Sequence, residues 1–306
     1  MTDAKVKVPP IKIQGIKTKL VPLIQACAAV GKETTWLEPF MGSGVVGLNL
    51  AGRNAVFADL NPHIISFYSQ LNKGAINSET VREFLEKNGA LLAEGGVDYY
   101  YFVRDRFNNE HCPLDFLFLN RSCFNGVIRF NKKHRFNVPF GHKPQRFAKA
   151  YVTKIVNQVK FVEAKMRANN WLFLCQPFED TIEMADKGSF VYCDPPYIGR
   201  HVDYFDSWDA EQEIRLYGCL AAKEARYMLS TWERNRHREN PYISGLWGNC
   251  QKTVREHFYF VGAKEANRNP VTEALLTNYA VDRARGAVPA QAELFLGGGM
   301  EGIRHG

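Results

Sequence analysis

The segment that most constrains the fold is an apolar run, residues 190–193, that ends in Asp194-Pro195-Pro196-Tyr197. An apolar, β-rich run of this length predicts a buried strand, and it must end at the prolines because proline cannot donate to a strand ladder. In open α/β sheets, the ligand crevice lies at the carboxyl ends of the strands. The sequence therefore predicts a functional site at these four residues, against the simpler interpretation of a turn with a buried tyrosine.

These residues suit an exocyclic amino nitrogen. Asp194 and the carbonyl of Pro195 can each accept one N–H, which leaves the nitrogen lone pair directed at an electrophile. Tyr197 offers a flat face to a heterocycle. The set predicts chemistry on the amino group of an aromatic ring, without a covalent nucleophile.

The first third of the chain has the residue order of a nucleotide-binding βαβ unit. Residues 35–40 and 55–58 are short apolar runs typical of strands, and a glycine turn (42–44) and a helix-like segment lie between them. The second run ends in Asp59, at the distance where a carboxylate takes ribose hydroxyls. This order predicts a doubly wound α/β sheet that binds a nucleoside-like ligand.

Three further residues are candidates for holding that ligand. Asp180 follows the expected strand 171–175 and can accept from an adenine amino group beside the ring of Phe178, and Lys17 can bind a carboxylate. Taken alone, Asp59 and Asp180 could each equally be a helix N-cap, and Lys17 could be a solvated residue at a helix start. Together, Asp59 and Asp180 predict an adenosine-shaped crevice.

The positive charge is concentrated in one part of the chain. The formal net charge is +7, and residues 116–162 hold ten Lys and Arg with no Asp or Glu. Phenylalanines are interleaved with these cations, and residues 129–136 have the alternation of a hairpin. Because a solvated surface normally mixes both signs of charge, this pattern favours contact with phosphates over a merely exposed face.

Composition also predicts what kinds of site are missing. The seven cysteines are scattered without the spacing of metal ligands, which predicts a reducing compartment and no structural metal. No run of about twenty apolar residues occurs, so we expect an intracellular, soluble protein without a membrane anchor.

In their order, these motifs resemble those of DNA adenine-N6 methyltransferases of the Dam type (D12 class, alpha-group motif order). The resemblance covers most of residues 10–280 and is most specific from 120 to 141, which is similar to the DNA-reading hairpin of the family. The other matching segments are Gly15-x-Lys17, Glu38-Pro39-Phe40-x-Gly42-x-Gly44, Asp59-x-Asn61, Phe178-x-Asp180, Asp194-Pro195-Pro196-Tyr197 and Leu276-Thr277-Asn278-Tyr279.

The resemblance implies a fold and a division into domains. We expect an α/β fold, a doubly wound, seven-stranded, Rossmann-like methyltransferase sheet with a smaller inserted domain, mainly helical with a β-hairpin. Residues 1–75 and 160–283 would form the S-adenosylmethionine-binding catalytic domain and 76–159 the DNA target-recognition domain. Residues 284–306 are expected to be a mobile tail.

The resemblance also implies the cofactor, S-adenosyl-L-methionine, and the reaction, methylation of the N6 amino group of a flipped adenine in double-stranded DNA. Catalysis is expected at Asp194, Pro195, Pro196 and Tyr197. The residues expected to bind the cofactor are Gly15, Lys17, Glu38, Pro39, Phe40, Gly42, Ser43, Gly44, Asp59, Leu60, Phe178, Asp180 and Asp194.

GATC or a related site is the expected target. Arg129 is expected to grip a guanine and Lys12 to read the first guanine, while Phe124 and Val127 fill the space that the flipped adenine leaves. The full set of expected DNA-binding residues is Lys12, Arg121, Phe124, Asn125, Val127, Arg129, Asn131, Lys132, Lys133, Asn137 and Pro139.

Other interpretations of the chain stay open. It could be a catalytically inactive DNA-binding protein with a methyltransferase fold, or a methyltransferase acting on cytosine N4 or on an amine in RNA. Those relatives usually have Ser or Asn where Asp194 stands, which argues against the second interpretation. We expect a monomer in the cytoplasm, of bacterial or phage origin and associated with the nucleoid, with a cognate restriction endonuclease as a possible partner.

Overall fold

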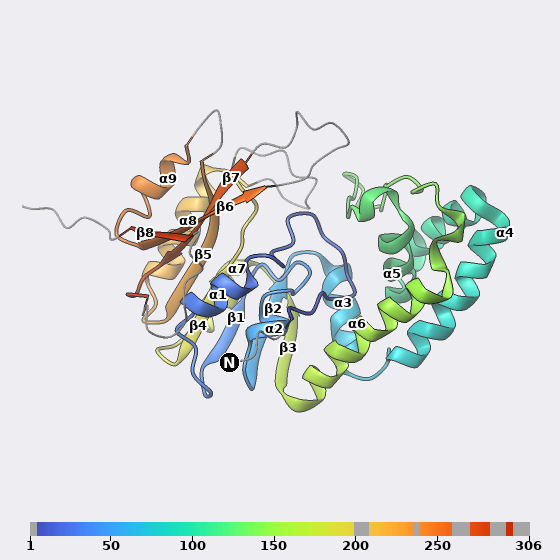
Figure 1. Cartoon of the computed structure of the whole chain (residues 1–306), viewed down its shortest axis with the longest axis horizontal. Coiled ribbons are helices and arrows are strands. Elements are labelled where there is room, and N and C mark those ends of the chain that lie inside the picture. The colour runs from blue at the N-terminus through green and yellow to red at the C-terminus, as the bar shows by residue number, and fades with distance from the viewer. Residues whose placement is uncertain (1–4, 199–207, 235–238, 259–269, 282–291, 296–306) are drawn as a thin grey trace, which may run out of the picture.

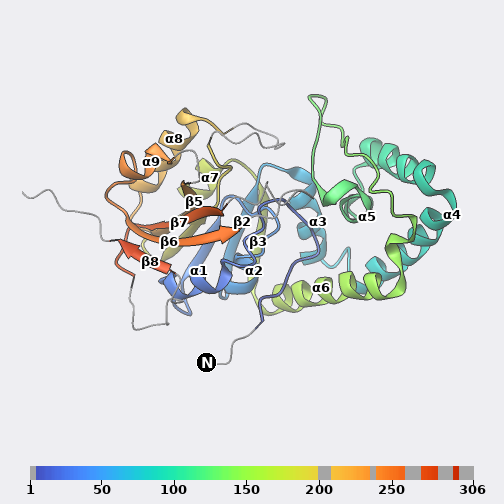
Figure 2. The same ribbon diagram turned by 45° about the horizontal axis from the view of Figure 1, so that its top comes forward.

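The computed structural model describes residues 5–198, 208–234, 239–258, 270–281 and 292–295. A sheet covered by helices forms one part, and a helical part lies beside it (Figure 1). The two parts are joined along α6 (Lys149–Ala168), which runs along the base of the helical part and leads back to the sheet (Figure 2).

Within the described residues, the sheet has eight strands. In spatial order they are β3 (Asn170–Cys175), β2 (Asn54–Asp59), β1 (Thr35–Glu38), β4 (Ser189–Cys193), β5 (Arg226–Arg234), β7 (Pro270–Thr277), β6 (Gln251–Phe258) and β8 (Ala292–Phe295). The first five are parallel, and the last three pair antiparallel. The direction of the strand order reverses between β1 and β4, which is where open α/β sheets form a ligand crevice at the carboxyl ends.

Alternating side chains of the central strands divide the core into two layers. Trp36 of β1 and Phe190 of β4 pack on one face of the sheet, while their neighbours Leu37 and Val191 pack on the other. This period of two is the pleat of a strand buried on both sides. It explains why these strands appear in the sequence as continuous apolar runs.

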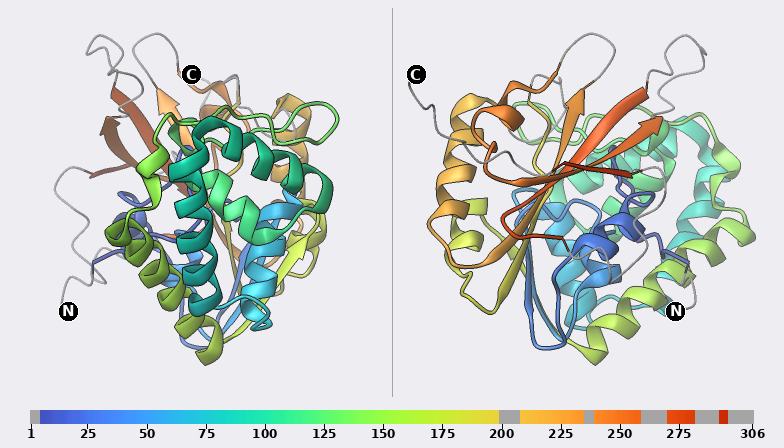
Figure 3. Two further views of the ribbon diagram at one scale, coloured as in Figure 1. Left: turned by 90° about the vertical axis from the view of Figure 1, so that its right-hand side faces the viewer. Right: turned by 60° about the vertical axis from the view of Figure 1, so that its left-hand side comes forward.

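Helices cover both faces of the sheet. Against the first face pack α1 (Val21–Cys27), α2 (Gly47–Leu50) and α3 (Pro62–Asn72), and against the second α7 (Phe178–Glu183) and α8 (Ala210–Ala221) (Figure 3). A further short helix, α9 (Pro241–Ser244), follows β5. None of the helices in the described residues is long and apolar enough to span a bilayer.

The helical part contains the segment that is expected to be the inserted domain, residues 76–159. It consists of α4 (Ser78–Glu110), α5 (Pro113–Ser122), the 3₁₀ helices η1 (Phe124–Gly126) and η2 (Pro144–Phe147), and most of α6. Asn77 caps α4 in a capping box, and Gly96, at φ 54°, interrupts the helix. Its core is continuous with the first layer of the sheet part, so the insert does not fold around a separate core.

The predicted hairpin is present between residues 129 and 137. Phe130 and Phe136 form an antiparallel bridge, and the Asn131 side chain accepts from the backbone amides of Lys133 and Arg135 to close the turn. Asn108 of α4 fixes the hairpin base, because its amide group both donates to and accepts from the backbone of Phe136. The hairpin is thereby held on the helical part.

One expectation about the end of the chain differs from the structure. Within the expected mobile tail, residues 292–295 form β8, an eighth strand on the edge of β6. The other residues from 284 to 306 lie outside the described residues.

Glu38, at the end of β1, is buried within the core. Its side chain is 2% exposed, and its Oε2 accepts from Trp36 Nε1 at 3.0 Å. A Cβ atom at Gly47 would overlap this oxygen, so α2 can approach β1 only because position 47 has no side chain. Burial raises the pKa of Glu38 to about 8, and the carboxyl is therefore protonated at neutral pH.

This buried carboxyl predicts a pH dependence of stability. Between the ordinary pKa of 4.5 and the folded value of about 8, the native protein holds a proton that the unfolded chain has released. The free energy of unfolding should therefore fall as pH rises through this window, by about 1 kcal/mol per pH unit. Glu38→Gln mimics the protonated form and should lack this loss. Urea unfolding of both proteins at about pH 6 and pH 8 measures the difference, and parallel pH dependences would contradict it.

Candidate active site

Asp194 follows directly after β4, a strand whose five residues are all buried between β1 and β5. Its Oδ1 lies 3.0 Å from the Nζ of Lys17, whose side chain is 6% exposed. The lysine comes from the loop before α1, so tertiary structure brings an ammonium group to the carboxylate at the reversal point of the sheet. Burial raises the pKa of Asp194 to about 6, against the opposing effect of Lys17.

Tyr197 and Glu273 complete this cluster. The Tyr197 hydroxyl donates to Glu273 Oε1 at 2.8 Å, and the same oxygen lies 3.9 Å from Lys17 Nζ. The Tyr197 ring packs on Trp232 of β5, with Lys17 Nζ 4.8 Å from the ring centroid. The sequence analysis did not select Glu273, although a carboxylate inside the otherwise uncharged strand β7 was a usable signal.

The role predicted for Lys17, binding of a cofactor carboxylate, stays a prediction. In the structure its ammonium contacts Asp194 and one face of Tyr197. These are the two contacts predicted for the amino group and ring of a target base. The ammonium therefore lies at ion-pair distance from the carboxylate, which offsets part of the cost of holding a charge in this half-buried position.

The glycine turn and Asp59 are held together as a second half of the site. The amide of Gly42 donates to Asp59 Oδ2 and the amide of Asn61 to Oδ1, both at 2.8 Å. Gly42 and Gly44 have φ values of 50° and 72°, which favour glycine. Burial raises the pKa of Asp59, and the two amides oppose that rise. The carboxylate is thus placed at the carboxyl end of β2, as predicted.

Aromatic rings form a wall beside this carboxyl edge. The rings of Phe40 and Phe178 stack with centroids 5.5 Å apart, and Trp208 packs edge-on to Phe40 at 5.4 Å. Glu213 of α8 fixes the tryptophan by accepting from its Nε1 at 2.6 Å. The sequence analysis did not select Trp208, because it lies in a polar stretch far from the glycine turn.

The remaining expected cofactor residues differ in accessibility. Gly15, Leu60 and Asp180 are exposed, with Asp180 in the first turn of α7. Pro39 and Ser43 are buried, and the Ser43 carbonyl accepts from the hydroxyl of Tyr68. Glu38 is also buried, in contact with the indole of Trp36, so its expected part in binding the cofactor is not supported by its position.

At the hairpin base, the expected wedge residues are accessible to different degrees. Phe124 is 52% exposed, and its amide is fixed by the carbonyl of Pro139 at 2.9 Å. Asn125 is exposed with φ 54°, and Val127 is half-buried against the core. Of the two apolar side chains, Phe124 is therefore the more accessible.

Arg129 is half-buried and engages Asn137 across the hairpin. Its Nε donates to Asn137 Oδ1 at 2.8 Å and its Nη2 to the Asn137 carbonyl at 3.3 Å. These bonds orient the guanidinium group. Around the turn, Asn131, Lys132 and Lys133 are exposed, as expected for contact with a backbone.

Arg121 is not available for DNA, contrary to expectation. It is 3% exposed, and its guanidinium donates to the Pro10 carbonyl at 2.7 Å and to Gln158 Oε1 at 2.6 Å. It ties the N-terminal segment to α6, a structural role that an arginine within a basic stretch does not reveal. Its Nη1 also donates to the Tyr151 hydroxyl at 3.4 Å.

Lys12 lies on this N-terminal segment. Its backbone amide and carbonyl pair with the side chain of Asn120 at 2.8 and 2.9 Å, which fixes it beside Gly126 at the hairpin base. Burial lowers the pKa of Lys12, and the nearby Tyr151 opposes that effect. The lysine is half-buried and close to the hairpin, as a residue that contacts the same ligand must be.

Comparison with known proteins assigns the family. The model of the D12 class N6 adenine-specific DNA methyltransferases matches residues 14–260. A DNA adenine methylase of Haemophilus influenzae is 35% identical over 196 residues, which are 62% of this chain and 63% of that protein. A DNA adenine methylase of Serratia marcescens is 35% identical over 167 residues, which are 53% of this chain and 57% of that protein. The matches thus span less than two thirds of these two relatives.

A longer match exists at lower identity. The type II methyltransferase M1.LlaDCHI of Lactococcus lactis subsp. cremoris is 28% identical over 290 residues, which are 89% of this chain and 95% of that protein. Because the family model covers most of the sequence, including the Asp194 motif, the glycine turn and the hairpin, this chain belongs to the D12 class N6 adenine-specific DNA methyltransferase family.

Proposed function

We propose that this chain transfers a methyl group from S-adenosyl-L-methionine to the N6 amino group of a flipped adenine in double-stranded DNA, at GATC or a related site. The observation that carries the proposal is the position of the Asp194 carboxylate at the reversal point of the sheet. There it contacts the Lys17 ammonium, which also lies over the ring of Tyr197, so the site already accommodates a nitrogen donor beside an aromatic ring. The names of the DNA adenine methylases among its relatives support the same reaction.

The residues around the glycine turn fit the proposed cofactor. Asp59 would accept from the ribose hydroxyls and Asp180 from the adenine amino group, while Phe178, Phe40 and Trp208 supply an apolar wall for the purine. When bound, S-adenosyl-L-methionine supplies a methyl group on a positively charged sulfur. The reversal point between β1 and β4 lies between this half-site and Asp194.

At the other half of the site, the chain orients the target nitrogen. Asp194 and the carbonyl of Pro195 would each accept a hydrogen bond from one N6–H group, which holds the amino group in a single orientation. The nitrogen becomes positive during the reaction, and the ionised Asp194 stabilises that charge in a buried position. Tyr197 would stack on the base, with its hydroxyl fixed by Glu273.

Binding of a base requires Lys17 to move. Its ammonium makes the contacts with Asp194 and Tyr197 that the target adenine would make, so lysine and base compete for one position. The exchange would replace the ammonium by the amino group of the base, so that Asp194 has a positively charged or N–H group beside it before and after binding. This limits the free-energy cost of admitting a neutral base.

Recognition of the DNA belongs to the hairpin and the N-terminal segment. Phe124 would fill the space left by the flipped adenine, and Arg129, oriented by Asn137, would read guanine O6 and N7. Lys12 would read a neighbouring guanine from the same side. The type II name of the Lactococcus relative supports a cognate restriction endonuclease as a partner.

Asp194→Ala should abolish methyl transfer, because the N6 amino group loses its ionised acceptor. A single-turnover assay with labelled cofactor measures the rate, and binding of the cofactor measured by calorimetry serves as the control for folding. In the wild-type protein, the rate should fall about tenfold per pH unit below the Asp194 pKa of about 6, as the carboxylate becomes protonated. A variant that keeps more than a small fraction of the wild-type rate would exclude this role.

Asp59→Ala and Asp180→Ala should each weaken cofactor binding by about ten- to a hundredfold, the range for a lost charge-assisted hydrogen bond. Titration calorimetry measures the affinity. Glu183→Ala is the matched control, since Glu183 is a carboxylate on the same helix as Asp180 but pairs with Lys223. Unchanged affinity in both aspartate variants would refute the crevice.

Arg129→Ala should cost about 1–3 kcal/mol of binding to the cognate duplex and relax discrimination at one base pair. Lys132→Ala, which removes an exposed cation from the same hairpin, should weaken binding to all duplexes alike. Affinities for cognate and scrambled duplexes at two salt concentrations separate these effects. Equal loss on both duplexes for Arg129→Ala would reduce that residue to a phosphate contact.

A further inference from the structure

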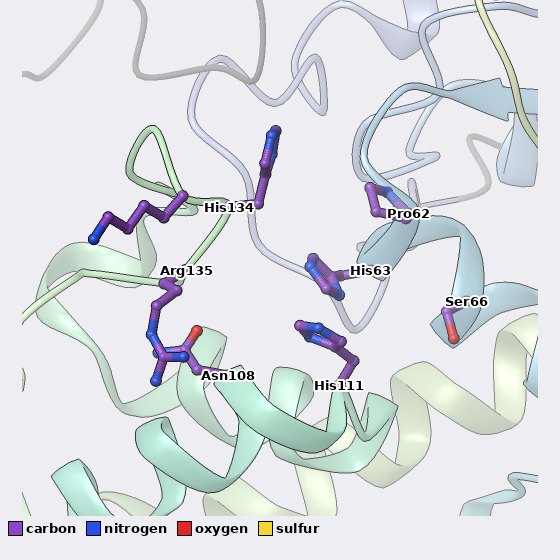
Figure 4. A pocket seen from close by; sticks show the side chains of 8 residues that line it. Pro62, His63, Ser66, Asn108, His111, His134 and Arg135 are labelled. Carbon is purple, nitrogen blue, oxygen red and sulfur yellow. The ribbon is translucent and has the colours of Figure 1, made fainter.

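An open cavity of about 640 Å³ lies between α3 and the recognition hairpin, outside the Asp194 cluster (Figure 4). Its walls come from three elements: the first turns of α3, the end of α4, and the tip of the hairpin. The residues that line it are Pro62, His63, Ser66, Asn108, His111, Lys133, His134 and Arg135.

The lining is one-sided in charge. Among the described residues that form it are three histidines, one lysine and one arginine, and none of these residues is acidic. Burial and the neighbouring His111 lower the pKa of His63 to about 4, so at neutral pH its ring offers polar nitrogens without a charge. The full positive charges come from Lys133 and Arg135. Such a lining favours an anion.

The floor of the cavity is rigid. The His63 ring, 8% exposed, stacks on Phe130 of the hairpin with centroids 4.9 Å apart and lies 5.0 Å from the ring of His111. Figure 4 shows the two histidines close together, one from each of the two parts of the protein. Asn108 bonds the backbone of Phe136 in both directions, which fixes the opposite wall. A ligand here would meet groups that are already in place.

The histidines do not form a metal site. Within the described residues, no group of three or more His, Cys, Asp or Glu side chains is placed to hold a metal ion. The cavity is also larger than a lone oxyanion needs, and its volume falls in the range of sites for ligands of many atoms. Size and charge together match a sugar-phosphate segment.

We propose that this cavity binds one backbone phosphate of the DNA duplex, beside the base pairs that the hairpin reads. The proposal rests on the proposed function, since it takes DNA as the ligand. Lys133 and His134 are exposed on the hairpin that carries Arg129, so a strand in contact with that arginine passes close to the opening. Such a contact sets the register of the protein on the duplex without reading sequence.

The test is a scan with duplexes in which one phosphate at a time is replaced by an uncharged methylphosphonate. Wild-type protein should lose about tenfold in affinity at one linkage near the target adenine. The variant His111→Asn/Arg135→Gln should bind the unmodified duplex less tightly and lose nothing more at that linkage. Asparagine suits position 111, where φ is 54°, so the first substitution adds no backbone strain.

The control is Lys154→Gln, which removes an exposed cation on α6, outside the cavity, and should keep the loss at that linkage. If wild type and the cavity variant lose equal affinity at every linkage, the proposal is wrong. A titration with inorganic phosphate, monitored through the histidine NMR signals, tests whether the cavity binds a free phosphate compound instead of DNA. Saturation at low millimolar phosphate without a linkage-specific loss would assign the cavity to a free phosphate compound and overturn the DNA assignment.

This experiment separates the failure of the cavity from the failure of the proposed function. Formation of N6-methyladenine in the unmodified duplex by the wild-type protein is measured first, and its absence would refute the proposed function. Methylation of that duplex together with a flat methylphosphonate scan would refute only the cavity.

Discussion

The site depends on the contact between the buried ammonium of Lys17 and the carboxylate of Asp194. A carboxylate in this position could not stay ionised without a donor, and the pKa of Asp194 already rises to about 6 despite the lysine. The contact fastens the loop before α1 to the end of β4, and Tyr197 and Glu273 are arranged around it. The proposed binding of a substrate amino group at Asp194 would displace this ammonium.

The glycine turn with Asp59 and the hairpin between residues 129 and 137 are joined by direct contacts. Phe130 of the hairpin stacks on His63, whose backbone amide donates to the side chain of Asn61, the cap of α3. The amide of Asn61 donates in turn to Asp59, the acid that holds the glycine turn. Since the core of the helical part is continuous with that of the sheet part, the hairpin and the glycine turn are supported by one packed interior.

Residues whose position depends on the neighbouring sequence can be predicted better than residues whose role depends on contacts with distant segments. Asp59 and Asp194 each follow an apolar run, so the end of a strand could be read directly and their positions at the carboxyl edge were correct. Arg121 shows the opposite case, because a basic stretch predicts phosphate contact for each of its cations alike. Its bonds to Pro10 and Gln158 come from segments more than thirty residues away. Only packing distinguishes such a buried arginine from an exposed one.

By itself, the sequence determined the parallel α/β core, the glycine turn with its acid, the inserted basic domain and the hairpin, because each depends on short-range periodicity or turn chemistry. The tertiary structure decided which charges meet. It placed Lys17 on Asp194, brought Glu273 to Tyr197, and buried Glu38 beneath α2. Contacts between distant segments depend on how strands order and helices pack, and a linear pattern does not contain that information.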